Sequence, residues 1–311
     1  MLGEFVMLNH LLLCMVVCLD HTSPDAGCYE KLLRRFSSGM GCLLQIDGEP
    51  FAYPQLEQVL ETVDALGIEG VGIRTGHPVS KAMAEMVATH KIRSVMLRRN
   101  AIEKQSIALL RAHCVPMELS ALITEDTPEQ LPQMLSMCRE CGIHSIVLEN
   151  GVIAQYRGEQ IKELPPKQKL HLMECCVQHN QSGFDVGISL SHCPNKVLIH
   201  PKWAKGDLLG GCSAGIISCA VNVDGSIIPC LPLYECVAGN IVQDDLLEVW
   251  EHAPVFQQLR TRDRLQGTCG GCEYRYACGG CRAVGFNATG DMMAPDYSCH
   301  LCAAEEWDGD G

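Results

Sequence analysis

The stretch CLLQIDGEPFAYPQLEQVLETVDALGIEGVGIRT, residues 42–75, carries the pattern that decides the fold. An apolar run at Cys42–Ile46 is followed by a helical pattern at Tyr53–Leu66, and a second apolar run follows at Gly70–Ile73. Gly67 comes directly after the helical pattern, and glycine at this position is a common helix C-terminal signal. The stretch therefore predicts a strand, a helix and a second strand in succession.

The same alternation continues to about residue 190. Further strands are predicted at Ser94–Leu97, Pro116–Leu122 and Ser145–Leu148. Further helices are predicted at Val79–Thr89, Ile102–His113 and Pro128–Cys141. Repeated β-α units of this length predict a parallel sheet with right-handed crossovers. About five or six units predict an α/β fold with a partial or full TIM-like (β/α) barrel, whose chemistry would lie at the C-terminal strand ends. A doubly wound sheet is the alternative.

The N-terminal segment Phe5–Leu19 is nearly all apolar. Glu4 is the only charge before it, so a basic n-region is missing, and no small-residue cleavage site follows. The segment is also too short to span a bilayer. We interpret it as a buried strand with its following loop, and a signal peptide is the alternative.

Charge and cysteine content narrow the class of protein. The 311 residues carry a formal charge of −13, which argues against broad contact with nucleic acid or anionic membranes. The 20 cysteines lie in a long chain and include tight CxxC clusters, which suit metal better than secreted disulfides. We therefore expect a cytoplasmic protein.

The character of the chain changes near residue 200, which divides it into predicted domains at 1–200 and 201–311. Ala220–Pro229 alternates around Asp224-Gly225, a strong hairpin signal. Short helices are predicted at Leu246–Glu251 and Val255–Arg260.

The last part of the chain, Gly267–Cys302, has too few apolar residues for a core of its own, which indicates that a bound group organises it. The preceding run of Arg260, Arg262 and Arg264 predicts a solvated face, with contact to an acidic substrate as the alternative.

Eight cysteines of this region suit metal binding. Four lie on one short glycine-rich loop: Cys269, Cys272, Cys278 and Cys281. Four more flank that loop: Cys212, Cys219, Cys230 and Cys299. Close spacing lets a tight loop wrap a metal centre, and eight thiolates suffice for two four-cysteine iron–sulfur clusters. For the loop alone, a structural four-cysteine zinc site is the alternative.

The sequence around these cysteines contains a dense set of motifs: Gly211–Gly215, Val223–Cys230, Gly239–Ile241, Leu247–Trp250, Phe256, Leu259-Arg260, Cys269–Arg275, Cys278–Ala283, Gly290-Asp291 and Cys299. Together they resemble the SPASM domain of radical SAM maturases over roughly residues 205–300. The run Cys-Gly-Gly-Cys-Arg-Ala and the Gly-Asp after it are most similar to the haem-pathway members, which modify siroheme-derived tetrapyrroles.

The resemblance implies two auxiliary [4Fe–4S] clusters with interleaved ligands. The first cluster would take Cys212, Cys230 and Cys281, with Cys219 as a candidate fourth ligand. The second cluster would take Cys269, Cys272, Cys278 and Cys299. Cys236 and Cys302 are left over and are interpreted as buried thiols.

A radical SAM enzyme also holds a cluster on a CxxxCxxC loop, where S-adenosyl-L-methionine (SAM) binds the open iron and yields a 5′-deoxyadenosyl radical. This chain offers Cys14, Cys18 and His21 in that spacing, with His in place of the third cysteine. Imidazole ligates iron in Rieske centres but raises the potential, which opposes SAM reduction. Cys28 as the third ligand, and no cluster at this loop, are the alternatives.

A second motif points to the same family. Asp47-Gly48-Glu49-Pro50 resembles the GGEP motif, so Gly48, Glu49 and Pro50 are implied to contact the amino group of SAM. Arg74-Thr75-Gly76 falls where the family often has Thr-Asn-Gly, and Gln155–Gly158 resembles its Gly-Arg segment.

The predicted function is that of a radical SAM/SPASM maturase, an oxidoreductase of cofactor biosynthesis or peptide modification. Its substrate would be a tetrapyrrole or a ribosomal peptide, and its electron donor a ferredoxin or flavodoxin. The alternative is a non-catalytic electron-transfer or substrate-presenting paralogue that has lost SAM cleavage. A zinc-binding interaction module is a third interpretation.

Overall fold

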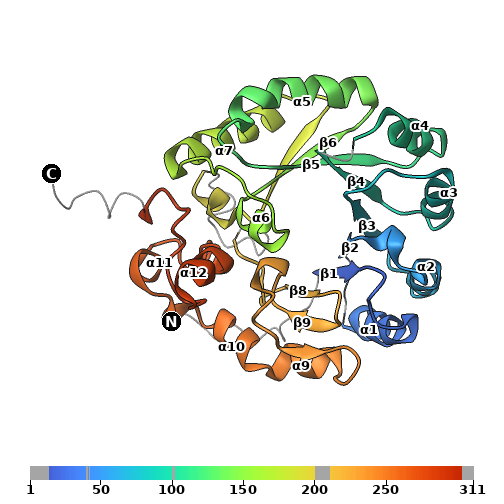
Figure 1. Cartoon of the computed structure of the whole chain (residues 1–311). Coiled ribbons are helices and arrows are strands. Elements are labelled where there is room, and N and C mark those ends of the chain that lie inside the picture. Colours follow the sequence, from blue (N-terminus) through green and yellow to red (C-terminus); the bar gives the residue numbers. More distant parts are fainter. Residues whose placement is uncertain (1–13, 40, 42, 100–101, 200–210, 303–311) are drawn as a thin grey trace. The chain divides into compact units, whose positions relative to one another are not determined.

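A computed structural model describes residues 14–39, 41, 43–99, 102–199 and 211–302 (Figure 1). The chain forms two compact units, and each contains two separate stretches of sequence. Unit 1 comprises Met1–Ile73 and Ser213–Arg260, and unit 2 comprises Arg74–Cys212 and Thr261–Gly311. The domain boundary predicted near residue 200 falls in 200–210, outside the described residues, and it stays a prediction.

Unit 1 is built on strand β1 (Cys14–Leu19), which pairs in parallel with both β2 (Leu43–Gly48) and β8 (Ser218–Val221). Strand β2 pairs in parallel with β3 (Gly70–Thr75). Strand β8 continues antiparallel into β9 (Ser226–Ile228), which pairs with β10 (Gly239–Asn240).

The helices of unit 1 are α1 (Ala26–Ser38), α2 (Leu56–Ala65), α9 (Leu246–His252) and α10 (Pro254–Arg260), with short 3-10 turns at Pro50–Ala52 and Leu231–Leu233. Helix α1 buries Tyr29, Leu33 and Phe36 almost completely. Burial of large apolar side chains is the main stabilising contribution in such a layer.

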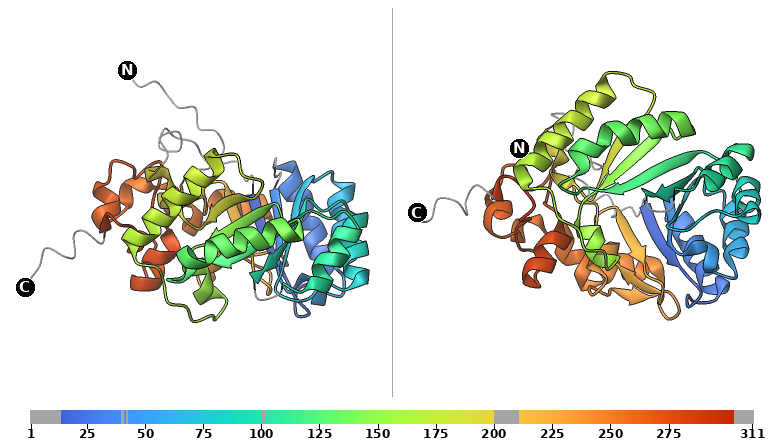
Figure 2. Two further views of the ribbon diagram at one scale, coloured as in Figure 1. Left: turned by 90° about the horizontal axis from the view of Figure 1, so that it is seen from above. Right: turned by 45° about the horizontal axis from the view of Figure 1, so that its top comes forward.

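Unit 2 contains four parallel strands in the order β4 (Ser94–Arg98), β5 (Met117–Leu122), β6 (Ser145–Glu149) and β7 (Gly187–Ser191). The intervening helices are α3 (Lys81–Thr89), α4 (Lys104–Ala112), α5 (Thr127–Cys141), α6 (Val152–Tyr156) and α7 (Pro166–Gln181). Figure 2 shows α5 and α7 side by side on the outer side of these strands. The predicted β/α repeats are confirmed.

The C-terminal stretch of unit 2 has little regular structure. It contains the short helices α11 (Gly267–Gly271) and α12 (Arg282–Thr289) and a 3-10 turn at Arg262–Arg264. A further 3-10 turn at Pro194–Leu198 follows β7.

The predicted hairpin and N-terminal strand are both present. Gly225 in the hairpin turn has φ +80°, a conformation that glycine adopts without steric cost. Strand β1 covers the C-terminal part of the predicted Phe5–Leu19 segment, whose residues before Cys14 lie outside the described ones. None of the helices in the described ranges is long and apolar enough to cross a membrane.

Candidate functional site

Five cysteines line one pocket in the C-terminal stretch of unit 2: Cys269, Cys272, Cys278, Cys299 and Cys302. Cys269 lies in α11 and Cys272 directly follows that helix, whereas the other three come from the loops around α12. The structure therefore brings together all four residues predicted for the second auxiliary cluster. Cys302, interpreted from the sequence as a leftover buried thiol, lies beside them.

Hydrogen-bond donors point at the sulfur atoms of this pocket. The backbone N–H of Asp296 donates to Cys269 Sγ at 3.3 Å, and the Arg282 guanidinium donates to the same atom at 3.6 Å. The backbone N–H of Gly280 donates to Cys278 Sγ at 3.4 Å. Such donors stabilise thiolates, and at an iron–sulfur cluster they tune the reduction potential.

Gly280 allows the loop to approach Cys269 closely. Its φ is +62°, and a Cβ at this position would lie 2.9 Å from Cys269 Sγ and 2.8 Å from Asp296 Cβ. Both the backbone conformation and the contact distance therefore require glycine. At least this glycine of the predicted metal loop therefore serves a close approach to a cysteine sulfur.

Buried charged side chains hold the pocket's loops together. Asp296 is fully buried and accepts hydrogen bonds from the Cys281 N–H at 2.7 Å and from Ser298 N and Oγ at 3.0 and 2.7 Å. Arg282, only 4% exposed, donates to the carbonyl oxygens of Met292 and Ala294 at 3.0 and 2.8 Å. These contacts add to a small apolar cluster of Leu265, Cys269 and Met293.

Arg262 connects the segment that contains Cys212 to the loop that contains Tyr276. It donates to the carbonyl oxygens of Cys212 at 2.8 Å and Tyr276 at 2.9 Å. Arg260, in unit 1, packs over the Trp250 ring at 4.5 Å. The prediction of a solvated face is therefore wrong for these two arginines, because carbonyl groups and an aromatic ring take the place of water.

The thiols of the pocket differ in acidity. A hydrogen bond with the Cys302 thiol lowers the pKa of Cys269 to about 6, and the same bond raises the pKa of Cys302. Burial raises the pKa of Cys278 to about 12 and that of Cys299 to about 11. Cys269 therefore loses its proton more readily than Cys278, Cys299 and Cys302.

The pocket's donor set fits an iron–sulfur cluster. Cluster sites in proteins are made of cysteine thiolates with hydrogen bonds to sulfur, and both are present here. No three His, Cys, Asp or Glu side chains in the described part of the chain are grouped as they would be around a single metal ion. A four-iron cluster spaces its thiolates more widely than one ion does.

The residues predicted for the first auxiliary cluster are divided between the units. Cys212 and Cys281 belong to unit 2, where Cys212 N–H donates to the Cys278 carbonyl at 2.9 Å. Cys219 and Cys230 belong to unit 1. Cys219 pairs with Met15 in the β1–β8 ladder, and burial raises its pKa to about 12. This ligand set stays a prediction.

The residues predicted for a SAM cluster lie in different local structures of unit 1. Cys14 and Cys18 are both in β1, and at the rise of an extended strand their Cα atoms are about 13 Å apart. His21 is exposed in the following turn, and Cys28 lies in the first turn of α1. The strand thus separates Cys14 from Cys18, and this ligand set also stays a prediction.

The Gly-Glu-Pro turn lies where β1 and β2 end. Gly48 ends β2 with φ +81°, and the Glu49 N–H donates to the Leu19 carbonyl, the last residue of β1, at 2.8 Å. Pro50 begins a 3-10 turn. The motif thus occupies the C-terminal strand ends, the face of a β/α fold that carries its chemistry.

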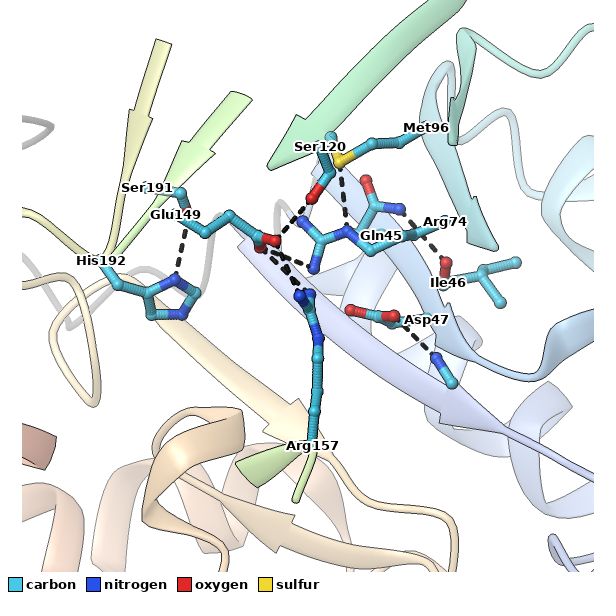
Figure 3. Close-up of polar contacts among 11 residues, drawn as sticks. Gln45, Ile46, Asp47, Arg74, Met96, Ser120, Glu149, Arg157, Ser191 and His192 are labelled. Atoms are coloured by element: carbon cyan, nitrogen blue, oxygen red, sulfur yellow. Dashed lines mark hydrogen bonds and ion pairs between the residues drawn. The ribbon is translucent and has the colours of Figure 1, made fainter. Parts of the chain in front are cut away.

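A buried charge network lies at strand ends of unit 2 (Figure 3). Glu149, the last residue of β6, is fully buried and contacts Arg74 at 3.1 Å and Arg157 at 2.9 Å. Ser120 Oγ of β5 donates to the same carboxylate at 2.5 Å. Burial alone would raise the pKa of Glu149, but the two guanidinium groups outweigh it and hold that pKa below its usual range.

The cysteine-rich stretch matches a known family. Residues 212–273 match the SPASM iron–sulfur cluster-binding domain. This chain carries a SPASM domain. Cys278, Cys281 and Cys299 lie beyond the matched residues.

Curated proteins are similar to larger parts of the chain. It is 29% identical over 218 residues to the AdoMet-dependent heme synthase of Methanosarcina barkeri, over 62% of this chain and 58% of that protein. It is 26% identical to the PqqA peptide cyclase of Gluconobacter oxydans, over 79% of this chain and 66% of that protein. The chain thus spans less than two thirds of the length of these two relatives.

Solved structures share the fold. SuiB of Streptococcus suis has a TM-score of 0.74 at 19% identity, covering 94% of this chain and 78% of that one. The anSMEcpe protein with bound AdoMet and a peptide has a TM-score of 0.65 at 15% identity, covering 93% and 94%. The predicted α/β fold, a partial TIM-like barrel followed by a cysteine-rich SPASM domain, is confirmed.

The buried roles of Asp296, Arg282 and Glu149 were not predicted from the sequence. Asp296 and Arg282 lie among the cysteines without a spacing that reports their burial. Glu149 did leave a signal, because a charged residue directly follows the predicted apolar strand Ser145–Leu148.

Proposed function

We propose that this protein is a radical SAM/SPASM maturase whose C-terminal pocket binds an auxiliary [4Fe–4S] cluster through Cys269, Cys272, Cys278 and Cys299. The observation that carries the proposal is the convergence of these four side chains on one pocket with donors aimed at sulfur. The first auxiliary cluster, with Cys212, Cys230 and Cys281 as ligands and Cys219 as the candidate fourth, is also part of the proposal.

The chain's own residues have distinct roles in this proposal. The turn Gly48-Glu49-Pro50 would hold the amino group of SAM, with the Glu49 carboxylate and backbone carbonyls as acceptors. The Glu149 network keeps the strand ends of unit 2 rigid, because three side chains share one buried carboxylate. When bound, SAM and a reduced cluster supply the 5′-deoxyadenosyl radical that no side chain can make.

The substrate is a tetrapyrrole or a ribosomal peptide in this proposal. The names of the relatives include both classes, a heme synthase and a peptide cyclase. A ferredoxin or flavodoxin in the cytoplasm would supply the electrons.

A second candidate function rests on strand β1. Cys14 and Cys18 are both in this strand, and His21 stands where the third cysteine of the loop is expected. This arrangement favours a non-catalytic paralogue that keeps the auxiliary clusters and has lost SAM cleavage. Its role would be electron transfer or substrate presentation.

Iron and sulfide content after anaerobic reconstitution, together with a 5′-deoxyadenosine assay in the presence of SAM and dithionite, tests the proposal. The maturase should hold about twelve irons, four for each of three clusters, and form deoxyadenosine. About eight irons and no deoxyadenosine would establish the second candidate.

A pair of cysteine variants tests the pocket itself. Cys272→Ala should lose about four irons per chain, the content of one cluster. Cys114→Ser is the matched control, because Cys114 is an exposed thiol that does not line the pocket. Equal iron content in the two variants would contradict the ligand assignment.

A further inference from the structure

A groove with apolar walls lies between α5 and α7 of unit 2, separate from the cysteine pocket of the same unit. Its volume is about 880 Å³. Apolar side chains of both helices and of the segment after α7 line it: Leu131, Pro132, Leu135, Leu172, Phe184 and Ile188. Phe184 is 56% exposed and stacks on His179 with ring centroids 4.5 Å apart, so an aromatic surface of the groove is open to solvent.

The groove has one cation at each end. Helices α5 and α7 lead into strands β6 and β7, which begin side by side at the paired residues Ser145 and Gly187, so the two helices run in the same direction. Lys167 lies in the first turn of α7, whereas Arg139 lies in the last turn of α5, and both line the groove. At the rise of an α-helix, the wall of α5 from Pro128 to Arg139 is about 17 Å long. No Asp or Glu is among the described residues that line the groove.

An acidic segment with a matching pattern, residues 303–311, directly follows the last described residue of the chain. It reads AAEEWDGDG, with four carboxylates, no basic residue, and Trp307 between the glutamates and the aspartates. Glu305 and Asp310 are five residues apart, a separation of about 17 Å in an extended chain. The acidic segment therefore has the same pattern as the groove with the opposite charge, an apolar centre with charged groups on both sides.

The acidic segment begins close to α7. Burial lowers the pKa of His300, and the Glu174 carboxylate of α7 opposes this shift, so the end of the described chain lies near that helix. Figures 1 and 2 show the same arrangement, with the red end of the chain beside α7. Cys175, the residue after Glu174, lines the groove. Five residues lead from Cys302 to Trp307, enough for an extended chain to cross about 17 Å.

We propose that the acidic segment docks in this groove of its own chain. Trp307 would pack on the stacked rings of Phe184 and His179, and the carboxylates on either side of it would pair with Arg139 and Lys167. Exposed charge pairs contribute little each, so the tryptophan ring should supply most of the affinity. Docking would tie the end of the cysteine-rich stretch to the β/α part of unit 2. The proposal does not rest on the proposed maturase function.

Alkylation of Cys175 tests the proposal, because this exposed thiol lines the groove and the docked segment would cover it. The full, cluster-loaded chain is treated with iodoacetamide, and mass spectrometry follows the modification of each cysteine. A tethered segment has an effective concentration in the millimolar range, so Cys175 should react at least about tenfold more slowly in the native chain than in Trp307→Ala.

Cys114 is the internal control for this experiment. It is also an exposed thiol but does not line the groove, so it should react at the same rate in the native chain and in Trp307→Ala. Equal rates for Cys175 in the two proteins would overturn the proposal.

Arg139→Glu combined with Lys167→Glu tests the charge pairing. The loss of two cations would by itself disfavour the thiolate and slow its alkylation, so faster labelling of Cys175 in this variant reports an uncovered groove. Replacement of all four carboxylates of the acidic segment by lysine should then restore the protection. Slow labelling in the charge-reversed groove, or fast labelling after the segment is reversed as well, would contradict the pairing.

Dilution shows whether the acidic segment docks in its own chain or in a second copy. The labelling rate of Cys175 in the native protein should stay constant over about 100-fold dilution, because a tethered contact does not depend on the protein concentration. A rate that rises on dilution to that of Trp307→Ala would overturn the assignment to the same chain and establish an exchange between two copies.

Discussion

The two parts of unit 2 are stabilised in different ways. The β/α part, which contains β4 to β7, buries apolar strand residues such as Leu119 and Leu148, both fully buried. The cysteine-rich part, Thr261–Cys302, relies on buried Arg282 and Asp296 and on backbone donors to sulfur. One part therefore folds by its own apolar burial, whereas the other, under our proposal, needs a bound cluster to complete it.

The largest expected loss of stability concerns Glu149, a buried charged residue in the otherwise apolar β/α part. Glu149→Ala removes the buried carboxylate that Arg74 and Arg157 share, and breaking a buried ion pair costs about 3–5 kcal/mol. Urea unfolding at pH 7 should show this loss of stability.

The same variant has a defined pH dependence. The pKa of Glu149 is lowered in the folded state, so its contribution is fully present above the unfolded value of 4.5 and disappears as pH falls through the folded pKa. The stability difference between native protein and Glu149→Ala should therefore shrink on acidification. A difference that grows at low pH would contradict the lowered pKa.

A substitution that opens a cavity in the β/α part tests whether that part is stabilised by its own apolar burial. Leu119→Ala opens a cavity in the core and should cost about 3 kcal/mol. Iron content after reconstitution should stay at the native level, because the side chain lies in β5 and does not line the cysteine pocket. Loss of iron in this variant would show that the two parts are not independently organised.

Asp296→Ala tests whether buried polar contacts stabilise the cysteine-rich part. It leaves the Cys281 N–H and the Ser298 donors without their buried acceptor, which should cost about 2 kcal/mol. Iron content should fall as well, because the lost carboxylate holds the Cys281 N–H, although the backbone N–H of residue 296 still reaches Cys269 Sγ. Asp263→Ala, at a 70% exposed carboxylate of the same part, is the control and should keep its iron.

Gly280→Ala should separate stability from cluster binding most sharply. A left-handed conformation costs a non-glycine residue about 1–2 kcal/mol, a small change in stability. The added methyl group would meet Cys269 Sγ, so the variant should lose about four irons, one cluster. Native iron content with a stability loss would contradict the role given to this glycine.

Sequence patterns predicted the β/α part better than the cysteine-rich part. Helices and strands such as α5 and β6 follow from apolar periodicity and from the glycine at residue 142, which are local signals. Asp296 and Arg282 act through contacts between loops, which no local spacing encodes.

Strand β1 shows the limit of motif spacing. The spacing of Cys14 and Cys18 fits a cluster loop, yet both residues lie in a strand that pairs with β2 and β8. Spacing alone does not distinguish a loop from an extended strand, whereas the apolar character of Phe5–Leu19 correctly predicted the strand that the structure describes.

Under our proposal, a bound cluster completes the cysteine-rich part of unit 2. Hydrogen exchange measured on the metal-free and on the reconstituted chain can test this role of the cluster. Cluster loading should slow exchange across Thr261–Cys302 by about 100-fold or more, since metal binding becomes folding free energy, while β4 to β7 stay protected in both states. Equal exchange in the two states across Thr261–Cys302 would contradict it.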